Sequence, residues 1–542
     1  CRFRLFYGLI AFAMAGVFLS DNAFGFLLFW ELMAVSGYFL ITTEDERADV
    51  RQAGLIYFVS THAGTLALLA MFGLVARDTG SFAFPAEGTL AASVPVFVLG
   101  IFGFGLKAGL MPLHIWLPAA HASAPSHASA LLSGIMIKTG IYGLVRLTSF
   151  FDHIPMSFGA TVLVLGILSG VMGVAFAVAQ HDIKRLLAYH SVENIGIIAM
   201  GLGLALLGRS VDMPLLVVLG SGGALLHVMN HGIFKPLLFY AAGAVIHGAG
   251  TRDIDLLGGI IHRAPRTALA FLVGAVAISG LPPLNGFVSE WFIYLAGFQS
   301  LLSGNRAMIA AALAIPALAL IGALALACFV KVFGVVFLGA PRSPEAQNVH
   351  EASSSMQLAM APLMLACAGI GLFPFAIAPL LDGALAAWLP GYQAPELLSV
   401  APLYALSIAA GVTVVVIGMV ALLLRLRRRT GDRQALTWGC GFSLPTPRMQ
   451  YTSSSFADSI VGLFQASLRT RRTLSPLNGM YPAEGHFHSH TADTVLDGLL
   501  LPLFHLCADL FTRVRAFIQN GATTFYLLCI GLTAIILLVV VL

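Results

Sequence analysis

Charged residues are scarce in this chain. Only 10% of its 542 residues are charged, against 58% that are hydrophobic, and the mean hydropathy is +0.90. A water-soluble protein of this composition would expose too much apolar surface, which excludes that class. Apolar runs such as 159–179 and 400–424 are long enough to cross about 30 Å of hydrocarbon. Apolar and polar residues do not alternate in these runs, which excludes a transmembrane β-barrel.

Closely spaced cysteines are also missing. The six cysteines contain no CxxC pair: Cys1, Cys328, Cys367, Cys440, Cys507 and Cys529. Iron–sulfur clusters, structural zinc and covalently attached haem use cysteine pairs or clusters. We therefore expect no metal, redox centre or other cofactor in this chain. The histidines of the stretch 485–490 could bind a metal, and a solvated loop is the alternative.

Apolar runs and the residues that interrupt them predict an all-α polytopic membrane protein. The predicted spans, about thirteen, are 5–20, 23–42, 53–76, 93–111, 127–147, 159–179, 186–207, 214–246, 267–298, 307–338, 356–380, 400–424 and 523–542. Prolines at Lys235-Pro236 and Leu281-Pro282-Pro283 predict tilted or broken helices. A membrane tolerates broken helices only inside protein or beside water.

Basic residues are divided unevenly between the two sets of loops. One set carries only four, Arg77, Arg146, Arg209 and Arg306. The other carries fifteen, namely Arg2, Arg4, Arg47, Arg51, Lys184, Arg185, Arg252, Arg263, Arg266, Arg342, Arg425, Arg427, Arg428, Arg429 and Arg433. Cytoplasmic loops carry the excess of basic residues. We therefore expect a multi-pass inner (plasma) membrane protein with its N-terminus and its tail (425–522) in the cytoplasm and its C-terminus outside. The chain opens on Cys1 without a cleavable signal, as a fragment would.

The tail is the one long weakly apolar region. Apolar residues follow a helical period at 456–468 and 503–517, and the uncharged run 523–542 comes next. An amphipathic helix before an apolar span predicts a strap that lies along the membrane and ends in an anchor. An ordinary docking helix is the alternative.

Lysine is concentrated in the apolar runs, whereas arginine lies mainly at their edges. Of the five lysines, Lys107, Lys138, Lys235 and Lys331 fall inside predicted spans, and Lys184 falls in a loop. A desolvated ammonium can release a proton, whereas a guanidinium stays charged almost anywhere. Because each buried charge costs about 2.5–3.5 kcal/mol to insert, we predict that these lysines handle protons. Buried ion pairs that only fix helix packing are the alternative.

Acidic residues accompany these lysines. Glu31 lies in the middle of the second span and is the expected partner of Lys107. Glu290 follows the proline break of its span and could end a proton path. Glu193 is either a point of proton uptake or an end group that reaches the membrane surface. Lys331, close to a cytoplasmic span end, is expected to extend its ammonium to that surface.

Three titratable residues share one helix face in the second half. His227, His231 and Lys235 recur every four residues, which spreads them over about 12 Å of helix. Such a row can pass protons through intervening water, so we predict a relay. A metal site is the alternative for the two histidines. The zinc-protease signature is absent, because no carboxylate follows His227.

A short internal repeat accompanies the two broken spans. GLMPL at 109–113 and GLPPL at 280–284 match at four of five positions, 171 residues apart. Each lies near an ionisable residue, Lys107 or Glu290, as in transporters built from two related halves. We divide the chain into a first half (1–150), a second half (151–345), peripheral spans (346–430), a tail (431–522) and an anchor span (523–542).

Two longer motifs are present, KAGLMPLHIWLP at 107–118 and DIKRLLAY at 182–189. They resemble motifs of the antiporter-like membrane subunits of respiratory complex I, multisubunit sodium/proton antiporters and membrane-bound nickel–iron hydrogenases. The resemblance covers about 5–380. Within that group, SGLPPLNGFVSEW at 279–291 and MQYTSSSF at 449–456 look most like component B of hydrogenase 4 and its formate hydrogenlyase counterpart.

The resemblance implies two inverted five-helix repeats, each with a broken helix, and a proton path along the middle of the membrane. The family's positions for that path fall on Glu31, Lys107, Lys138, His227, His231, Lys235 and Glu290. Family members have further helices before the first repeat, which this chain lacks. The complex I subunit with the long lateral helix has lysine where this chain has Glu290, which argues against that subunit.

We therefore expect a proton-translocating, non-catalytic membrane subunit of a respiratory oxidoreductase complex, specifically a group 4 nickel–iron hydrogenase or formate hydrogenlyase. Its expected partners are protons, the lipid bilayer, other membrane subunits and, through them, a peripheral hydrogenase or dehydrogenase arm, with no nucleic acid. One alternative is a subunit of a sodium/proton antiporter, although no cluster of carboxylates and carbonyls for sodium is evident. A purely structural membrane anchor is the other.

Overall fold

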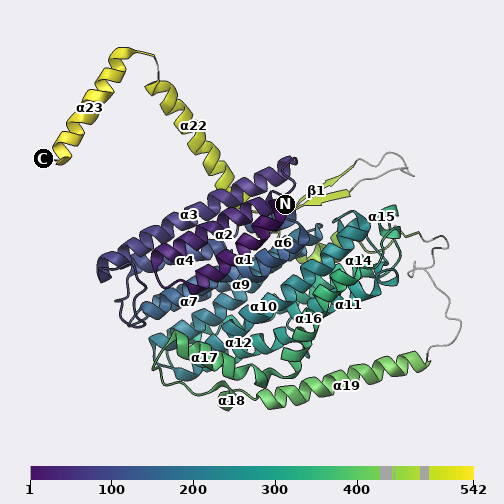
Figure 1. Cartoon of the computed structure of the whole chain (residues 1–542). Coiled ribbons are helices and arrows are strands. Elements are labelled where there is room, and N and C mark those ends of the chain that lie inside the picture. Colours follow the sequence, from purple (N-terminus) through teal and green to yellow (C-terminus); the bar gives the residue numbers. More distant parts are fainter. Residues whose placement is uncertain are drawn as a thin grey trace.

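Long apolar helices lie side by side and form the body of the protein (Figure 1). The computed structural model describes residues 2–427, 449–475, 487–519 and 521–541, and also residues 442, 444, 446 and 447. Several residues that the sequence singles out lie outside the described residues: Cys1, Arg428, Arg429, Arg433, Cys440, Gly485 and His486.

The chain up to residue 150 forms seven α-helices, with a π-helical turn at Leu132–Met136. They are α1 (Arg2–Leu19), α2 (Ala23–Ile41), α3 (Ala48–Thr79), α4 (Val94–Ala108), α5 (Leu117–Ser123), α6 (Ser126–Leu131) and α7 (Ile137–Phe150). The next seven are α8 (Met156–Val178), α9 (Ile183–Ser210), α10 (Pro214–Ala249), α11 (Pro265–Ile278), α12 (Asn285–Leu301), α13 (Arg306–Ala311) and α14 (Ala314–Phe337).

Peripheral helices and the tail complete the described chain. They are α15 (Pro344–Gln347), α16 (Ser354–Leu372), α17 (Ala378–Trp388), α18 (Leu397–Val400), α19 (Leu403–Arg427), α20 (Ser453–Leu463), α21 (Gln465–Leu468), α22 (Leu501–Ile518) and α23 (Thr523–Val541). The tail also contains a two-stranded antiparallel sheet of β1 (Arg471–Leu474) and β2 (Phe487–His490). Helices α22 and α23 project away from the bundle in Figure 1.

The predicted all-α membrane class is confirmed. Eleven helices of the described residues are long and apolar enough to cross a membrane, and three shorter apolar helices accompany them. Two of these shorter helices, α4 and α11, belong to apolar runs that are interrupted. The third is the segment Pro374–Trp388. The division into two inverted repeats stays a prediction.

Proline breaks only one of the two helices in which the sequence predicts a tilt or a break. The break at Leu281–Leu284 is confirmed, because it separates α11 from α12. The alternative of a break at Lys235-Pro236 is wrong, because α10 continues through Pro236. The proline ring packs on Gly134, where an added Cβ would lie 2.6 Å from Pro236 Cγ. Neighbouring protein thus surrounds this proline, as it must inside a membrane.

Helix α9 is the buried axis of the bundle. All residues of its most apolar stretch are buried, and it packs closely on α8 and α10. Small residues permit this approach: a Cβ added to Gly196 would lie 2.4 Å from the backbone nitrogen of Gly170 on α8. Polar side chains on α9 are therefore held away from solvent.

Candidate functional site: a buried series of ionisable side chains

Lys107 lies where α4 ends. The helix stops at Ala108, and Gly109 follows with the left-handed φ of 79° that favours glycine. Lys107 is only 1% exposed, and its ammonium donates no hydrogen bond within the protein. Its Nζ lies 5.0 Å from the ring centre of Trp30 and 6.0 Å from that of Tyr57. A buried, unpartnered ammonium beside a helix break is a group that can exchange a proton.

Glu31 does not bond to Lys107, which corrects the direct pairing expected from the sequence. Its carboxylate accepts a hydrogen bond from Thr65 Oγ1 and lies 3.2 Å from His62 Nε2. Both partners come from α3, which packs between α2 and α4. The charge of Glu31 still acts on Lys107. Glu31 and Lys107 are therefore neighbours without a shared hydrogen bond.

Lys138 connects the first half to the buried axis. Its Nζ donates to Ser133 O at 2.5 Å, inside the π-helical turn. The Ser133 hydroxyl lies 2.8 Å from the Ser191 hydroxyl on α9. His121 on α5 is also fully buried, and neither of its ring nitrogens has a hydrogen-bond partner. A buried imidazole without partners is another group available for proton transfer.

Lys184 does not lie in a loop, which corrects that expectation. It is in the first turn of α9, is 5% exposed, and donates to Ala124 O. Asp182 caps this helix by accepting from the backbone nitrogens of Lys184 and Arg185. Capping by Asp182 starts α9 three residues earlier than the predicted span, and Lys184 therefore lies in its first turn.

The predicted row on α10 is present and fully buried. His227, His231 and Lys235 are each 0% exposed, and the helix between them is continuous. His227 bridges two helices, because Nδ1 lies 2.9 Å from Ser289 Oγ and Nε2 lies 3.0 Å from Asn194 Oδ1. Neither His231 nor Lys235 has a hydrogen-bond partner within the protein. The row thus combines one fixed imidazole with two groups free to bind water or protons.

Glu193 is buried, so the interpretation as a surface-reaching end group is wrong. It is 0% exposed in the third turn of α9, and its carboxylate accepts from His190 Nδ1. The second carboxylate oxygen of Glu193 and Nε2 of His190 have no partner. The charge of Glu193 acts on Lys235, which places an acid–base pair beside the α10 row.

Glu290 lies at the second broken helix. It is 5% exposed on α12, and its carboxylate packs on Gly280, where an added Cβ would lie 2.4 Å from Oε2. Gly280 has a φ of 61°, so the turn and the close approach both require glycine. Asn230 links α10 to the same break by donating to Asn285 O at 2.8 Å.

Lys331 does not extend to the membrane surface, which corrects that expectation. It is 1% exposed, and its Nζ donates to Val178 O at 2.7 Å and to Gln180 O at 3.1 Å. These carbonyls lie at the C-terminal end of α8, where unpaired carbonyls attract a cation.

Sequence reasoning missed several polar residues that join the predicted ones. They are His62, His121, His190, Asn194 and Ser289. The contact of His190 with Glu193 could have been predicted, because His190 lies three residues before Glu193 on a helix. His62 and Ser289 carry no such signal, because their partners belong to other helices.

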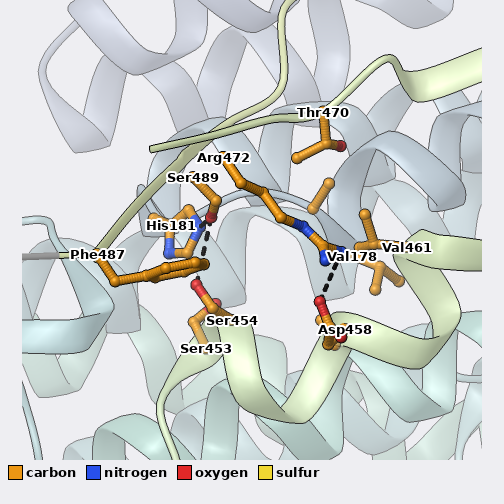
Figure 2. A pocket seen from close by; sticks show the side chains of 12 residues that line it. Val178, His181, Ser453, Ser454, Asp458, Val461, Thr470, Arg472, Phe487 and Ser489 are labelled. Atoms are coloured by element: carbon orange, nitrogen blue, oxygen red, sulfur yellow. Dashed lines mark hydrogen bonds and ion pairs between the residues drawn. The ribbon is translucent and has the colours of Figure 1, made fainter. Parts of the chain in front are cut away.

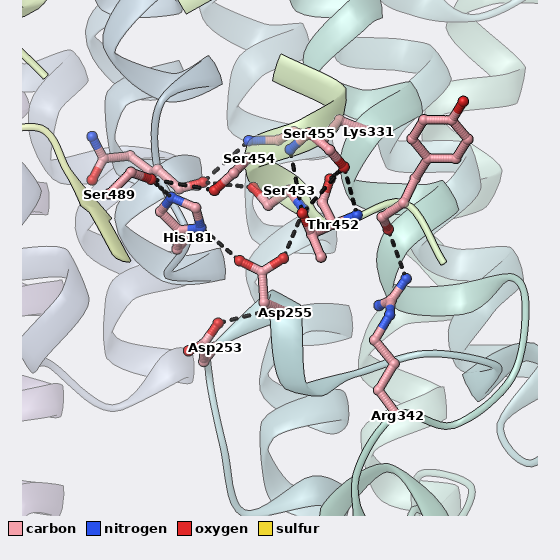
Figure 3. A network of polar contacts seen from close by, with 12 residues as sticks. His181, Asp253, Asp255, Lys331, Arg342, Thr452, Ser453, Ser454, Ser455 and Ser489 are labelled. Atoms are coloured by element: carbon pink, nitrogen blue, oxygen red, sulfur yellow. Dashed lines mark hydrogen bonds and ion pairs between the residues drawn. The ribbon is translucent and has the colours of Figure 1, made fainter. Parts of the chain in front are cut away.

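A second set of polar contacts joins the tail to one end of the bundle. We call this end the tail face; its segments are 179–183, 251–263 and 338–343, against which residues 449–455 and 487–493 pack. His181 lies 2.6 Å from Asp255 through Nδ1 and 2.8 Å from Ser489 Oγ through Nε2 (Figure 3). Although burial raises it, hydrogen bonds from His181 and the Ser453 backbone hold the pKa of Asp255 below its ordinary value.

One tail carboxylate reaches the broken first-half helix. Asp493 is 2% exposed, and its Oδ2 lies 3.0 Å from His114 Nε2 and 3.0 Å from the Tyr189 hydroxyl. Burial raises its pKa, but the His114 contact and backbone hydrogen bonds outweigh burial and lower the pKa of Asp493 to about 2. The ionised carboxylate therefore links the tail to the α4–α5 break and to α9.

No group of three histidines, cysteines or acidic residues in the described chain is arranged to hold a metal ion. His488 and His490, the described histidines of the predicted alternative metal stretch, lie on β2. The ionisable groups of the described site are lysine, histidine and glutamate side chains, which can bind and release protons.

Comparison with known proteins identifies the family of this chain. The NADH:quinone oxidoreductase/Mrp antiporter transmembrane family matches residues 20–318. Hydrogenase-4 component B of Escherichia coli (strain K12) is 35% identical over 99% of this chain and 82% of its own length. Formate hydrogenlyase subunit 3 of the same organism is 36% identical over 87% of this chain and 76% of its own length.

The fold is also found in a solved structure. A chain of the membrane-bound sulfane sulfur reductase, an archaeal respiratory membrane complex, superposes with a TM-score of 0.74 at 22% sequence identity. The match covers 98% of this chain and 83% of that one. The resemblance predicted from the sequence motifs is thus confirmed, and the protein belongs to the NADH:quinone oxidoreductase/Mrp antiporter family of transmembrane subunits.

Proposed function

We propose that the protein is the proton-translocating membrane subunit of a group 4 nickel–iron hydrogenase or formate hydrogenlyase. The observation that carries this proposal is the series of buried ionisable side chains at the two broken helices and along α10. Several of them, including Lys107, His231 and Lys235, have no hydrogen-bond partner within the protein. Buried charges without a hydrogen-bond partner fix no ion pair between helices, so proton transfer explains them better than a structural role.

In this proposal, protons move between Glu31, Lys107 and Lys138 in the first half and along His227, His231 and Lys235 to Glu290 in the second. Ser133, Ser191 and Asn194 connect the two groups through α9. Each protonation changes the electrostatic field at the next site, so occupation of one site favours release from its neighbour. The chain itself supplies no electron transfer, and distant redox chemistry would drive the series through partner subunits.

We propose an orientation with the N-terminus and the tail in the cytoplasm and the C-terminus outside, following the uneven distribution of basic residues. Helix α22 would then be a strap along neighbouring membrane subunits, with α23 as its anchor. Exposed apolar side chains on α22, such as Leu506, Leu510 and Phe517, support a partner there. A peripheral hydrogenase arm would bind through those subunits. The five-part division of the chain belongs to the same proposal.

The sodium/proton antiporter is the alternative from the same family. Dependence of proton movement on sodium separates the two functions. We expect proteoliposomes containing the isolated complex, driven by a reduced viologen dye, to take up protons equally in sodium-free potassium buffer and in sodium buffer. Uptake that requires sodium would support the antiporter. Electron transfer without any proton movement would support a purely structural anchor.

A further inference from the structure

We propose that protons reach the second-half series through a group of hydrogen-bonded side chains on the tail face. We call this group the uptake cluster; its members are His181, Asp255, Lys331, Ser453 and Ser489. The inference rests on the proposed function, because it names the side from which the series is loaded. It also assigns a role to titratable groups that the series at the broken helices does not use.

The outer part of the uptake cluster is accessible to water. The side chains of His181 and Asp255 are 27% and 26% exposed. Both ring nitrogens of His181 are engaged, Nδ1 by Asp255 at 2.6 Å and Nε2 by Ser489 at 2.8 Å (Figure 3). An imidazole held at both nitrogens can accept a proton on one side and release one on the other.

The inner part leads from Asp255 to Lys331. The second oxygen of Asp255 accepts from the Ser453 backbone nitrogen at 2.6 Å. Ser453 Oγ and Lys331 Nζ both donate to Gln180 O, at 3.5 Å and 3.1 Å. This shared carbonyl places the buried ammonium next to the exposed acid, and their charges act on each other. Lys331 is thus the first fully buried titratable group below the tail face.

From Lys331 the titratable groups continue into the bundle axis. The charge of Lys331 acts on His190, whose ring centre lies 4.5 Å from that of Phe329 on the same helix as Lys331. His190 bonds Glu193 through Nδ1, and the charge of Glu193 acts on Lys235. Titratable groups therefore continue from the water-exposed edge through Lys331, His190 and Glu193 to the α10 row.

Helix capping explains part of the uptake cluster. Lys331 caps the C-terminal carbonyls of α8, and Asp255 binds the first backbone nitrogen of α20. Capping does not explain why Nε2 of His190 and one oxygen of Glu193 are buried without partners. Leaving such buried groups unpaired destabilises the folded protein. A proton-transfer path uses both of these atoms, and it therefore accounts for them where helix capping does not.

Two conservative variants separate transfer from capping. Lys331→Arg keeps a donor for the α8 carbonyls but does not release its proton. His181→Gln keeps donor and acceptor groups but does not titrate. In proteoliposomes of the assembled complex, we expect each variant to reduce proton uptake about tenfold or more, a loss typical of removing one proton-transfer group. Hydrogen exchange of segment 487–500 should remain unchanged, because the tail stays docked.

Arg472→Gln is the matched control from the same contact. Arg472 pairs with Asp458 beside the uptake cluster without touching His181 (Figure 2), and both side chains are about half exposed. We expect this variant to transport protons at the wild-type rate, because an exposed ion pair contributes little to stability. A reduced rate would mean that disturbing the tail is itself sufficient to slow proton transport, and this result would overturn the uptake path.

Lys107→Arg, measured in the same preparation, distinguishes failure of this inference from failure of the proposed function. If Lys107→Arg loses transport while His181→Gln and Lys331→Arg keep it, protons do not enter through the uptake cluster, and the proposed function stands. If all three variants transport protons as the wild type does, the proposed function itself is wrong.

Discussion

Replacing Lys107 with arginine is expected to leave the complex assembled and to abolish its proton transport. Arginine keeps the positive charge next to Trp30 and Tyr57, where a cation is favoured. A guanidinium does not release its proton near neutral pH, whereas a buried ammonium does. The measurement is the rate of proton uptake by proteoliposomes, with the amount of assembled complex determined by native gel electrophoresis.

The larger guanidinium could also disturb packing around Lys107, so the variant needs a stability control. Lys107→Met removes the charge but leaves the contacts of Glu31 with Thr65 and His62 in place. We expect Lys107→Met to lose transport as well, and thermal unfolding of both variants shows whether either change acts through stability. If Lys107→Arg assembles and pumps at the wild-type rate, Lys107 does not titrate during transport.

Replacing Asp493 with leucine is expected to release the tail from the bundle. The substitution leaves the His114 ring and the Tyr189 hydroxyl without their buried acceptor, at a cost of about 1–3 kcal/mol for each group. It also removes the acceptor for the backbone nitrogens of Val495 and Leu496. Hydrogen exchange of segment 487–500 should become much faster, while exchange in α9 stays slow.

Asp458→Leu is the control for the Asp493 variant, because it removes an exposed tail carboxylate whose pair with Arg472 contributes about 0–1 kcal/mol. We expect tail exchange in this variant to match the wild type.

Lowering the pH should release the tail from the bundle, as the Asp493 substitution does. The pKa of Asp493 is about 2, so its stabilisation is complete above the ordinary value of about 3.9 and is lost as the pH falls toward 2. Unchanged exchange after Asp493→Leu would show that other contacts hold the tail.

The sequence predicted the helices and the buried lysines because both depend on local composition. Glu31, Lys107, Lys138 and Lys235 stand out as charges within apolar runs, and the structure buries the three lysines almost completely. Glu31 stays partly exposed, and its bonds to α3 were not predictable, because they depend on how α2 and α3 pack. Contacts between helices are long-range in sequence and leave no periodic signal.

The corrected residues share one physical cause. Lys184, Glu193 and Lys331 were assigned from their distance to a span end, as if lipid or water surrounded each helix. The structure surrounds all three with other helices instead, and it provides backbone carbonyls or a histidine as partners. Of the tilt or break expected at Pro236, the break does not occur, because α10 is continuous there and the proline ring packs on Gly134. Local rules describe a single helix, whereas tertiary packing decides the environment of its side chains.

The most direct test of proton movement along the buried series is the number of protons transported per electron transferred by a complex with Lys235→Arg. Lys235 follows the two histidines on the continuous helix α10, and the charge of Glu193 acts on it. Both fluxes would be measured in the same proteoliposomes, with an uncoupler added to obtain the unrestrained electron-transfer rate. If protons cross through the series, the ratio falls to the background of protein-free liposomes while uncoupled electron transfer continues. A wild-type ratio in an assembled Lys235→Arg complex would contradict this route.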